Sequence, residues 1–215
     1  MHRYDKRYWL LAACLSALAG FIDAVGFSRM GGFFVSFMSG NTTRLAVGTV
    51  QNAGVAATAG ALILLFVLGA TAGALAAQLS GARRKAAVLA LVTLLLLVAA
   101  LAGDAGLARL CIGAMTLAMG AVNSVFLRDG EVSIGLTYMT GTLVRLGQRL
   151  ATTLTGGERW SWLPYLLLWL GLLCGAILGA FAFARVGLDA LWIAAASAGL
   201  MTLGVLTIPS FRGPA

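Results

Sequence analysis

Residues 38–45, Met-Ser-Gly-Asn-Thr-Thr-Arg-Leu, recur about a hundred positions later as residues 139–146, Met-Thr-Gly-Thr-Leu-Val-Arg-Leu. Two flanking segments repeat in the same order, with single-residue slips between them: Gly20–Val25 as Gly120–Val125, and Leu68–Ala74 as Leu170–Ala176. The three offsets are 100, 101 and 102. The chain therefore consists of a duplicated unit. In apolar chains such duplications are typical of membrane transporters, whose sites form where two repeats meet.

The composition indicates an integral membrane protein. Hydrophobic residues make up 60% of the chain and charged residues 10%, whereas charged residues are about a quarter of a soluble domain. Six stretches reach or approach the roughly 20 apolar residues that a membrane-spanning helix needs: Tyr8–Phe27, Val55–Leu79, Ala86–Ala102, Leu107–Leu127, Trp160–Ala184 and Leu191–Ile208. We therefore expect one all-α membrane domain over 1–215, with repeat one at about 8–102 and repeat two at about 107–208.

Basic residues decide between two topologies. The segments Gly31–Val50 and Glu131–Thr155 carry the repeated motif, and the number of spans depends on whether they cross. If both cross, there are eight helices and parallel repeats. If neither crosses, there are six, both termini are cytoplasmic, and eleven basic residues lie inside: Arg3, Lys6, Arg7, Arg83, Arg84, Lys85, Arg128, Arg145, Arg149, Arg159 and Arg212. Only Arg29, Arg44, Arg109 and Arg185 then lie outside, so the positive-inside rule favours six spans.

Three spans in each half make the two repeats inverted. Each motif segment then enters the membrane from one side and returns, as an apolar approach, a glycine-containing turn and a helix. Non-helical backbone at that depth is tolerated only where it is buried in protein or lines a wet cavity. We therefore expect two re-entrant, broken helical segments whose tips converge near the bilayer midplane.

The motif residues suit a binding site at two helix starts. Ser, Thr and Asn cap the free N–H groups of a first helical turn, and such a turn carries a partial positive charge. Arg44 and Arg145 would add full charges, which favours a small anionic or polar solute. The predicted substrate-binding residues are Ser39, Gly40, Asn41, Thr42, Arg44, Thr140, Gly141, Thr142 and Arg145. The alternative is that these side chains only cap helices in a folded-back loop.

Asp23 lies well inside the first apolar stretch, and Asn123 is its counterpart in the second repeat. A charge inside a bilayer is costly, so such residues usually face a cavity or a partner. Two interpretations are open: a coupling or gating group that changes protonation, or a static ion pair with Arg44.

Glycines at matched places predict close helix contacts. Gly69 and Gly73 are four apart, as are Gly171 and Gly175, and small residues at this spacing let helix backbones approach. The contact predicted is either between the repeats or between copies of the chain in a homo-oligomer.

Charge and motifs narrow the partners. The formal net charge is +8, but the basic residues are few and sit at span ends, so we expect contact with lipid headgroups and no binding of nucleic acid. The single histidine, His2, is terminal. No metal-ligand spacing, phosphate-binding loop or nucleophile with a base is evident, so we expect no enzyme activity, cofactor or metal.

The run Gly-Phe-Ile-Asp-Ala-Val-Gly-Phe at residues 20–27, followed by Met-Ser-Gly-Asn-Thr at 38–42, resembles the YoaK-like family of small bacterial membrane proteins. That family has a similar Asp-containing helix followed by a Thr-Gly-Asn motif, and Ser39 replaces the Thr here. The resemblance implies a multi-pass protein of the bacterial cytoplasmic (inner) membrane, in a family without an established biochemical role.

Together these features predict a secondary transporter or channel-like permease for a small anionic or polar solute, held at the midplane between two helix N-termini. The alternative is a non-transporting membrane scaffold or assembly subunit, in which the polar residues are structural and the glycine pairs contact a partner.

Overall fold

The structure is a computed structural model that describes residues 6–128, 131–132 and 134–207. His2, Arg3, Ile208 and Arg212, which the sequence analysis placed, lie outside the described residues. The described chain is helical apart from one short strand pair, and its elements follow in this order: α1 (Lys6–Met30), α2 (Met38–Gln51), α3 (Ala53–Leu79), η1 (Gly81–Arg83), α4 (Arg84–Asp104), α5 (Ala108–Ala121), η2 (Val122–Phe126), β1 (Leu127–Arg128), β2 (Glu131–Val132), α6 (Met139–Leu154), α7 (Leu163–Val186), η3 (Gly187–Asp189) and α8 (Ala190–Thr207).

The prediction of an all-helical membrane protein is confirmed. Within the described residues, five segments are long and apolar enough to span a bilayer: Trp9–Met30, Ala53–Leu79, Gly81–Asp104, Ala108–Phe126 and Leu163–Thr207. The last segment contains both α7 and α8. The motif helices α2 and α6 are not among the five. With 14 and 16 residues they extend about 21 and 24 Å at 1.5 Å per residue, less than the ~30 Å hydrocarbon core.

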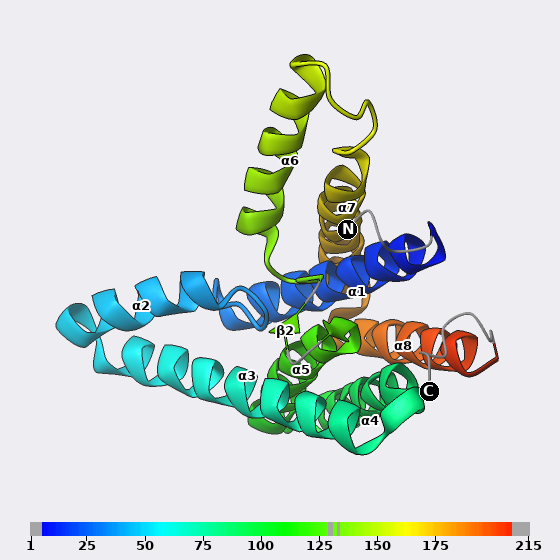
Figure 1. Cartoon of the computed structure of the whole chain (residues 1–215). Helices are drawn as coiled ribbons and strands as arrows, with labels where there is room; N and C mark the ends of the chain where they lie inside the picture. The colour runs from blue at the N-terminus through cyan, green and yellow to red at the C-terminus, as the bar shows by residue number, and fades with distance from the viewer. Residues whose placement is uncertain (1–5, 129–130, 133, 208–215) are drawn as a thin grey trace.

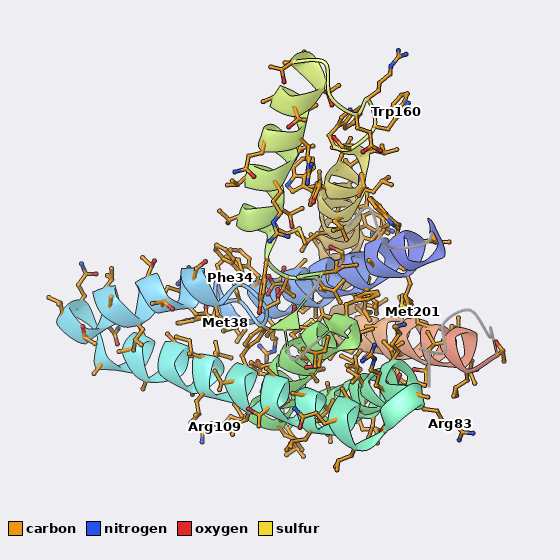
Figure 2. The ribbon with its side chains drawn as sticks, viewed as in Figure 1. Phe34, Met38, Arg83, Arg109, Trp160 and Met201 are labelled. Carbon is orange, nitrogen blue, oxygen red and sulfur yellow. The ribbon has the colours of Figure 1, made fainter. Side chains whose placement is uncertain are left out.

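The buried core is formed mainly by α1, α4, α5 and α8. Leu15 and Ile22 of α1, Leu89 of α4, Met115 of α5 and Leu191 of α8 have no exposed surface. Large apolar side chains are also exposed on α3 and α7, as lipid contact requires of a membrane protein. Figure 1 shows two arms that lead away from the centre, one of α2 and α3 and one of α6 and α7. Trp160 lies at the far end of the second arm (Figure 2), and 60% of the surface of this residue is exposed.

The helix ends follow from local sequence. Glycine tolerates positive φ, and Gly31 and Gly32, with φ of 64° and 107°, turn the chain out of α1. The N–H of Gly32 donates to the carbonyl of Phe27 at 2.9 Å, which closes the helix. Asn52 alone separates α2 from α3, and its side-chain oxygen accepts from the N–H groups of Gly54 and Val55, so it caps α3.

The first helix of each half packs on the third helix of the other half. A Cβ added at Gly20 of α1 would overlap the carbonyl oxygen of Leu172 in α7, and one at Gly120 of α5 would overlap that of Phe66 in α3. The surrounding contacts match pair by pair. Leu117 of α5 packs on Gly69 of α3 in the same way as Ala17 of α1 packs on Gly175 of α7. Likewise, Ala121 packs on Gly73 and Phe21 packs on Gly179. This reciprocal exchange is what a two-fold relation between the halves produces.

These contacts correct the repeat alignment of the third helices. The sequence matched Gly69 with Gly171, an offset of 102, whereas the structure matches Gly69 with Gly175, an offset of 106. The difference is about one helical turn. It follows from the connection before each third helix, which is a single residue in the first half and residues 155–162 in the second. The glycine pairs thus join the two halves within one chain, and a homo-oligomer stays a prediction.

We predict that Gly20→Ala and Gly120→Ala each lower the free energy of unfolding by about 1–3 kcal/mol, because the added carbon meets backbone that cannot yield. Gly204→Ala is the matched control: a Cβ there meets nothing within 4 Å, so we expect a gain of about 0.5–1 kcal/mol from helix propensity. Thermal melting of the purified protein in detergent measures both. Equal effects at all three positions would contradict the packing described.

Candidate functional site

The two motif segments meet at the centre of the molecule. A cavity of about 250 Å³ is lined from both halves by residues 36–39 and 137–141, with Phe66 of α3 as the remaining wall. Met38 lies at this central position in Figure 2, at the start of α2. Of the predicted binding residues, Ser39, Thr140 and Gly141 line this cavity together. The cavity is bounded by side-chain hydroxyls and by the first turns of α2 and α6, whose leading N–H groups have no partner within a helix.

A larger cavity of about 570 Å³ adjoins the first and shares Ser36, Phe37, Thr137 and Met139 with it. It lies between α1 and α7, and Asp23 is part of its wall. The first cavity is the more polar of the two, and the two lie side by side as a smaller and a larger chamber.

Asp23 holds the segment that leads into α2. Its Oδ1 accepts hydrogen bonds from the backbone N–H groups of Val35 at 2.8 Å and Ser36 at 2.9 Å. These two bonds satisfy two main-chain donors of a non-helical segment. Inside a membrane such donors need a partner within the protein, because no water is there to bind them.

Asn123 lies at the matching position of the second half and contacts its approach segment through a different partner. Its Oδ1 accepts from the hydroxyl of Thr137 at 3.1 Å, and its Nδ2 donates to the carbonyl of Met119 at 3.0 Å. Ser16 of α1 adds a second tie, donating to the carbonyl oxygens of Leu136 and Leu168. Asp23 and Asn123 thus both anchor the approach to a motif helix.

The expected ion pair between Asp23 and Arg44 is absent, and that interpretation was wrong. Arg44 instead places its guanidinium 4.9 Å from the centre of the Phe33 ring and packs against Gly32. It borders a separate cavity between α2 and the start of α3. Arg145 is exposed on α6. Both arginines therefore lie outside the two central chambers.

The predicted capping role was also wrong. Within the described chain, α2 and α6 begin after Phe37 and Tyr138, and neither start has a side-chain cap. Asn41 is fully buried in the first turn of α2 and folds back on Phe34, donating to its carbonyl at 2.6 Å and accepting from its N–H at 3.1 Å. The side chain thus bonds a backbone unit of the approach segment, where a cap would bond the helix.

The remaining motif residues serve packing. The hydroxyls of Thr42 and Thr142 donate to carbonyls four residues earlier in the chain, those of Met38 and Tyr138. Gly40 is covered by the rings of Phe37 and Phe34, so a Cβ there would lie 2.6 Å from a Phe37 ring atom. These three residues lie outside the solute-sized cavity, although the sequence placed them in it.

Sequence reasoning missed Ser36, Thr137 and Tyr138, all of which line the smaller cavity. The repeat itself held the signal for two of them. Ser36 and Thr137 are hydroxyl residues at the offset of 101 that relates the two motifs, two positions before each helix start.

We predict that Asp23→Ala speeds hydrogen exchange of the Val35 and Ser36 amides, because their shared acceptor is removed, whereas Asp23→Asn keeps them protected. The amide in Asn123 already fills the corresponding role, which makes Asn the matched control. Hydrogen exchange with mass-spectrometric detection gives both rates. If the Asn and Ala variants exchange equally fast, the side-chain oxygen at position 23 does not protect the Val35 and Ser36 amides.

Comparison with known proteins agrees with this picture. The family model described as "Protein of unknown function (DUF1275)" matches residues 11–204. The UPF0700 transmembrane protein RA0705 of Rhizobium meliloti (strain 1021) is 41% identical over 199 residues, which are 93% of this chain and 86% of that protein. No solved structure matches the chain. The expectation of a small membrane protein, from a family without an established role, is confirmed.

Proposed function

The chain belongs to the DUF1275 family of multi-pass membrane proteins, and we propose that it is a secondary transporter or channel-like permease for a small anionic or polar solute. One observation carries the proposal: the repeated motifs from the two halves line a single central cavity of about 250 Å³. Discontinuous helices that meet near the middle of a repeat protein are how several transporter folds build their sites.

The proposed solute contacts come from both halves. Ser39 and Thr140 offer hydroxyls, and the first turns of α2 and α6 offer backbone N–H groups with a partial positive charge. Arg44 and Arg145 contribute no direct contact in this arrangement. An anion would therefore be held by the hydroxyls and backbone N–H groups at the two helix starts, without an arginine. Asp23 and Asn123 would act as gating residues, since each holds the segment that forms its half of the cavity.

The proposed arrangement in the membrane has six spans. α1, α3, α4, α5 with η2, α7 and α8 would cross, and the short helices α2 and α6 would enter from opposite faces. Three crossings per half make the repeats inverted, with the two-fold axis in the membrane plane. The bacterial inner membrane and cytoplasmic termini are part of this proposal.

Filling the cavity tests the solute site. A Cβ at Gly141 meets nothing within 4 Å, so we expect Gly141→Val to fold normally and to abolish solute binding. Gly147→Val is the matched control on the same helix, with equally open surroundings outside the cavity. A thermal-shift screen with small carboxylates, phosphate, sulfate and neutral polar solutes reports binding, because a ligand of the native state raises its melting temperature. Stabilisation of the Gly141→Val protein equal to that of the parent would overturn the assignment.

Sidedness tests the topology. The turn Gly81–Arg83 precedes α4 and the turn before Arg109 follows it, and Arg83 and Arg109 lie well apart at the periphery in Figure 2. In a chain with Cys14, Cys111 and Cys174 replaced by alanine, we expect Ala82→Cys to react with a membrane-impermeant maleimide only after permeabilisation. We expect Ala105→Cys to react in intact cells. The reverse pattern would contradict cytoplasmic termini with six spans.

A further inference from the structure

The larger central chamber is apolar and aromatic. Its volume of about 570 Å³ is in the range of small-molecule sites. Phe27, Phe34 and Phe37 all line it and contact one another, with ring centres 5.0 Å apart for the first two and 5.1 Å apart for the last two. Figure 2 shows Phe34 at the centre of the molecule, where α1 and the start of α2 meet. A connected aromatic wall offers the faces to which organic cations are attracted.

Among the described residues that line this chamber, Asp23 is the single ionisable side chain. Within the described part of the chain no ion pair involves Asp23, and Arg44, the partner considered in the sequence analysis, is turned onto Phe33. An unpaired carboxylate inside a bilayer is costly and marks functional positions.

The second half has an uncharged residue at the matching position. Asn123 anchors its own segment through an uncharged carbonyl oxygen, and the two N–H groups bound by Asp23 reach a single oxygen that an amide also possesses. An amide oxygen at position 23 could accept the same two backbone hydrogen bonds, so these bonds do not by themselves require a negative charge.

We propose that the larger chamber binds a hydrophobic organic cation, with the Asp23 carboxylate as counter-ion and the Phe27, Phe34 and Phe37 rings as its aromatic wall. The ligand class is a compact cation with apolar substituents, such as a quaternary ammonium, a phosphonium or a protonated tertiary amine. This site goes beyond the proposed solute site: it is a different chamber, and it selects the opposite charge.

Two ions of nearly the same shape and opposite charge provide the test. Tetraphenylphosphonium and tetraphenylborate are added to the purified full-length protein in detergent, and binding is measured by equilibrium dialysis. We expect saturable binding of the phosphonium near one ion per chain, and far weaker binding of the borate. Equal binding of both ions would overturn the proposal, because it would show an apolar groove without charge selection, as for a lipid tail. No saturable phosphonium binding would overturn it as well.

Two variants locate the binding. Asp23→Asn should weaken phosphonium binding by about tenfold or more, as expected when one partner of a desolvated charge pair is removed. Ala180→Phe, which narrows the chamber from α7 without touching Asp23, should weaken it too. Gly141→Val, in the smaller cavity, should leave phosphonium binding unchanged, so this result is separable from the solute site. Wild-type phosphonium affinity in both Asp23→Asn and Ala180→Phe would overturn the assignment.

Discussion

Close backbone contact between the first helix of each half and the third helix of the other is the constraint on which the rest of this structure depends. Lipid gives little hydrophobic drive for helices to associate, so packing must come from surfaces that approach closely. Gly20 and Gly120 supply that approach, each against a carbonyl oxygen of the opposite half. Asp23 and Asn123 follow three residues later on their helices, so the two crossings set both anchors at matched positions. The central cavity forms between the segments that these anchors hold.

Among the described residues, the two anchored segments are held by different kinds of hydrogen bond. In the first half, Asp23 and Asn41 together bond the backbone of Phe34, Val35 and Ser36 through four hydrogen bonds. In the second half, Asn123 reaches a side-chain hydroxyl, Ser16 reaches one carbonyl of the segment, and Thr142 bonds only to the turn at the start of α6. The two halves thus build matching walls of the cavity with different sets of bonds.

Much of the fold could be predicted because hydropathy and repetition are global properties of the chain. Each of the six apolar stretches coincides with a long helix or, for α5, a helix continued by η2. The register between the halves could not be predicted, because glycines at 171, 175 and 179 offer two equally spaced matches to Gly69 and Gly73. Only the packing against Ala17 and Phe21 selects one of them.

The site was harder to predict, because the type of a residue does not specify which way its side chain points. Asn41 has the chemistry of a helix cap, yet its side chain turns back onto Phe34. Asn52, outside the motif, caps the next helix, α3. Arg44 and Arg145 recur in register, yet one stacks on Phe33 and the other is exposed. Repetition of an arginine does not by itself place charge in a cavity.

A duplicated protein supplies its own internal control. Features that occur in both halves, such as the glycine crossings and the side-chain anchors, are what any functional copy of the unit needs in order to fold. Features that differ can be assigned to work that only one half performs. At the centre the anchors match in position and nearly in shape, and they differ in chemistry: Asp23 can carry a negative charge and Asn123 cannot. The bilayer penalises a charge at this position, and the proposed cation in the chamber beside Asp23 would offset that penalty.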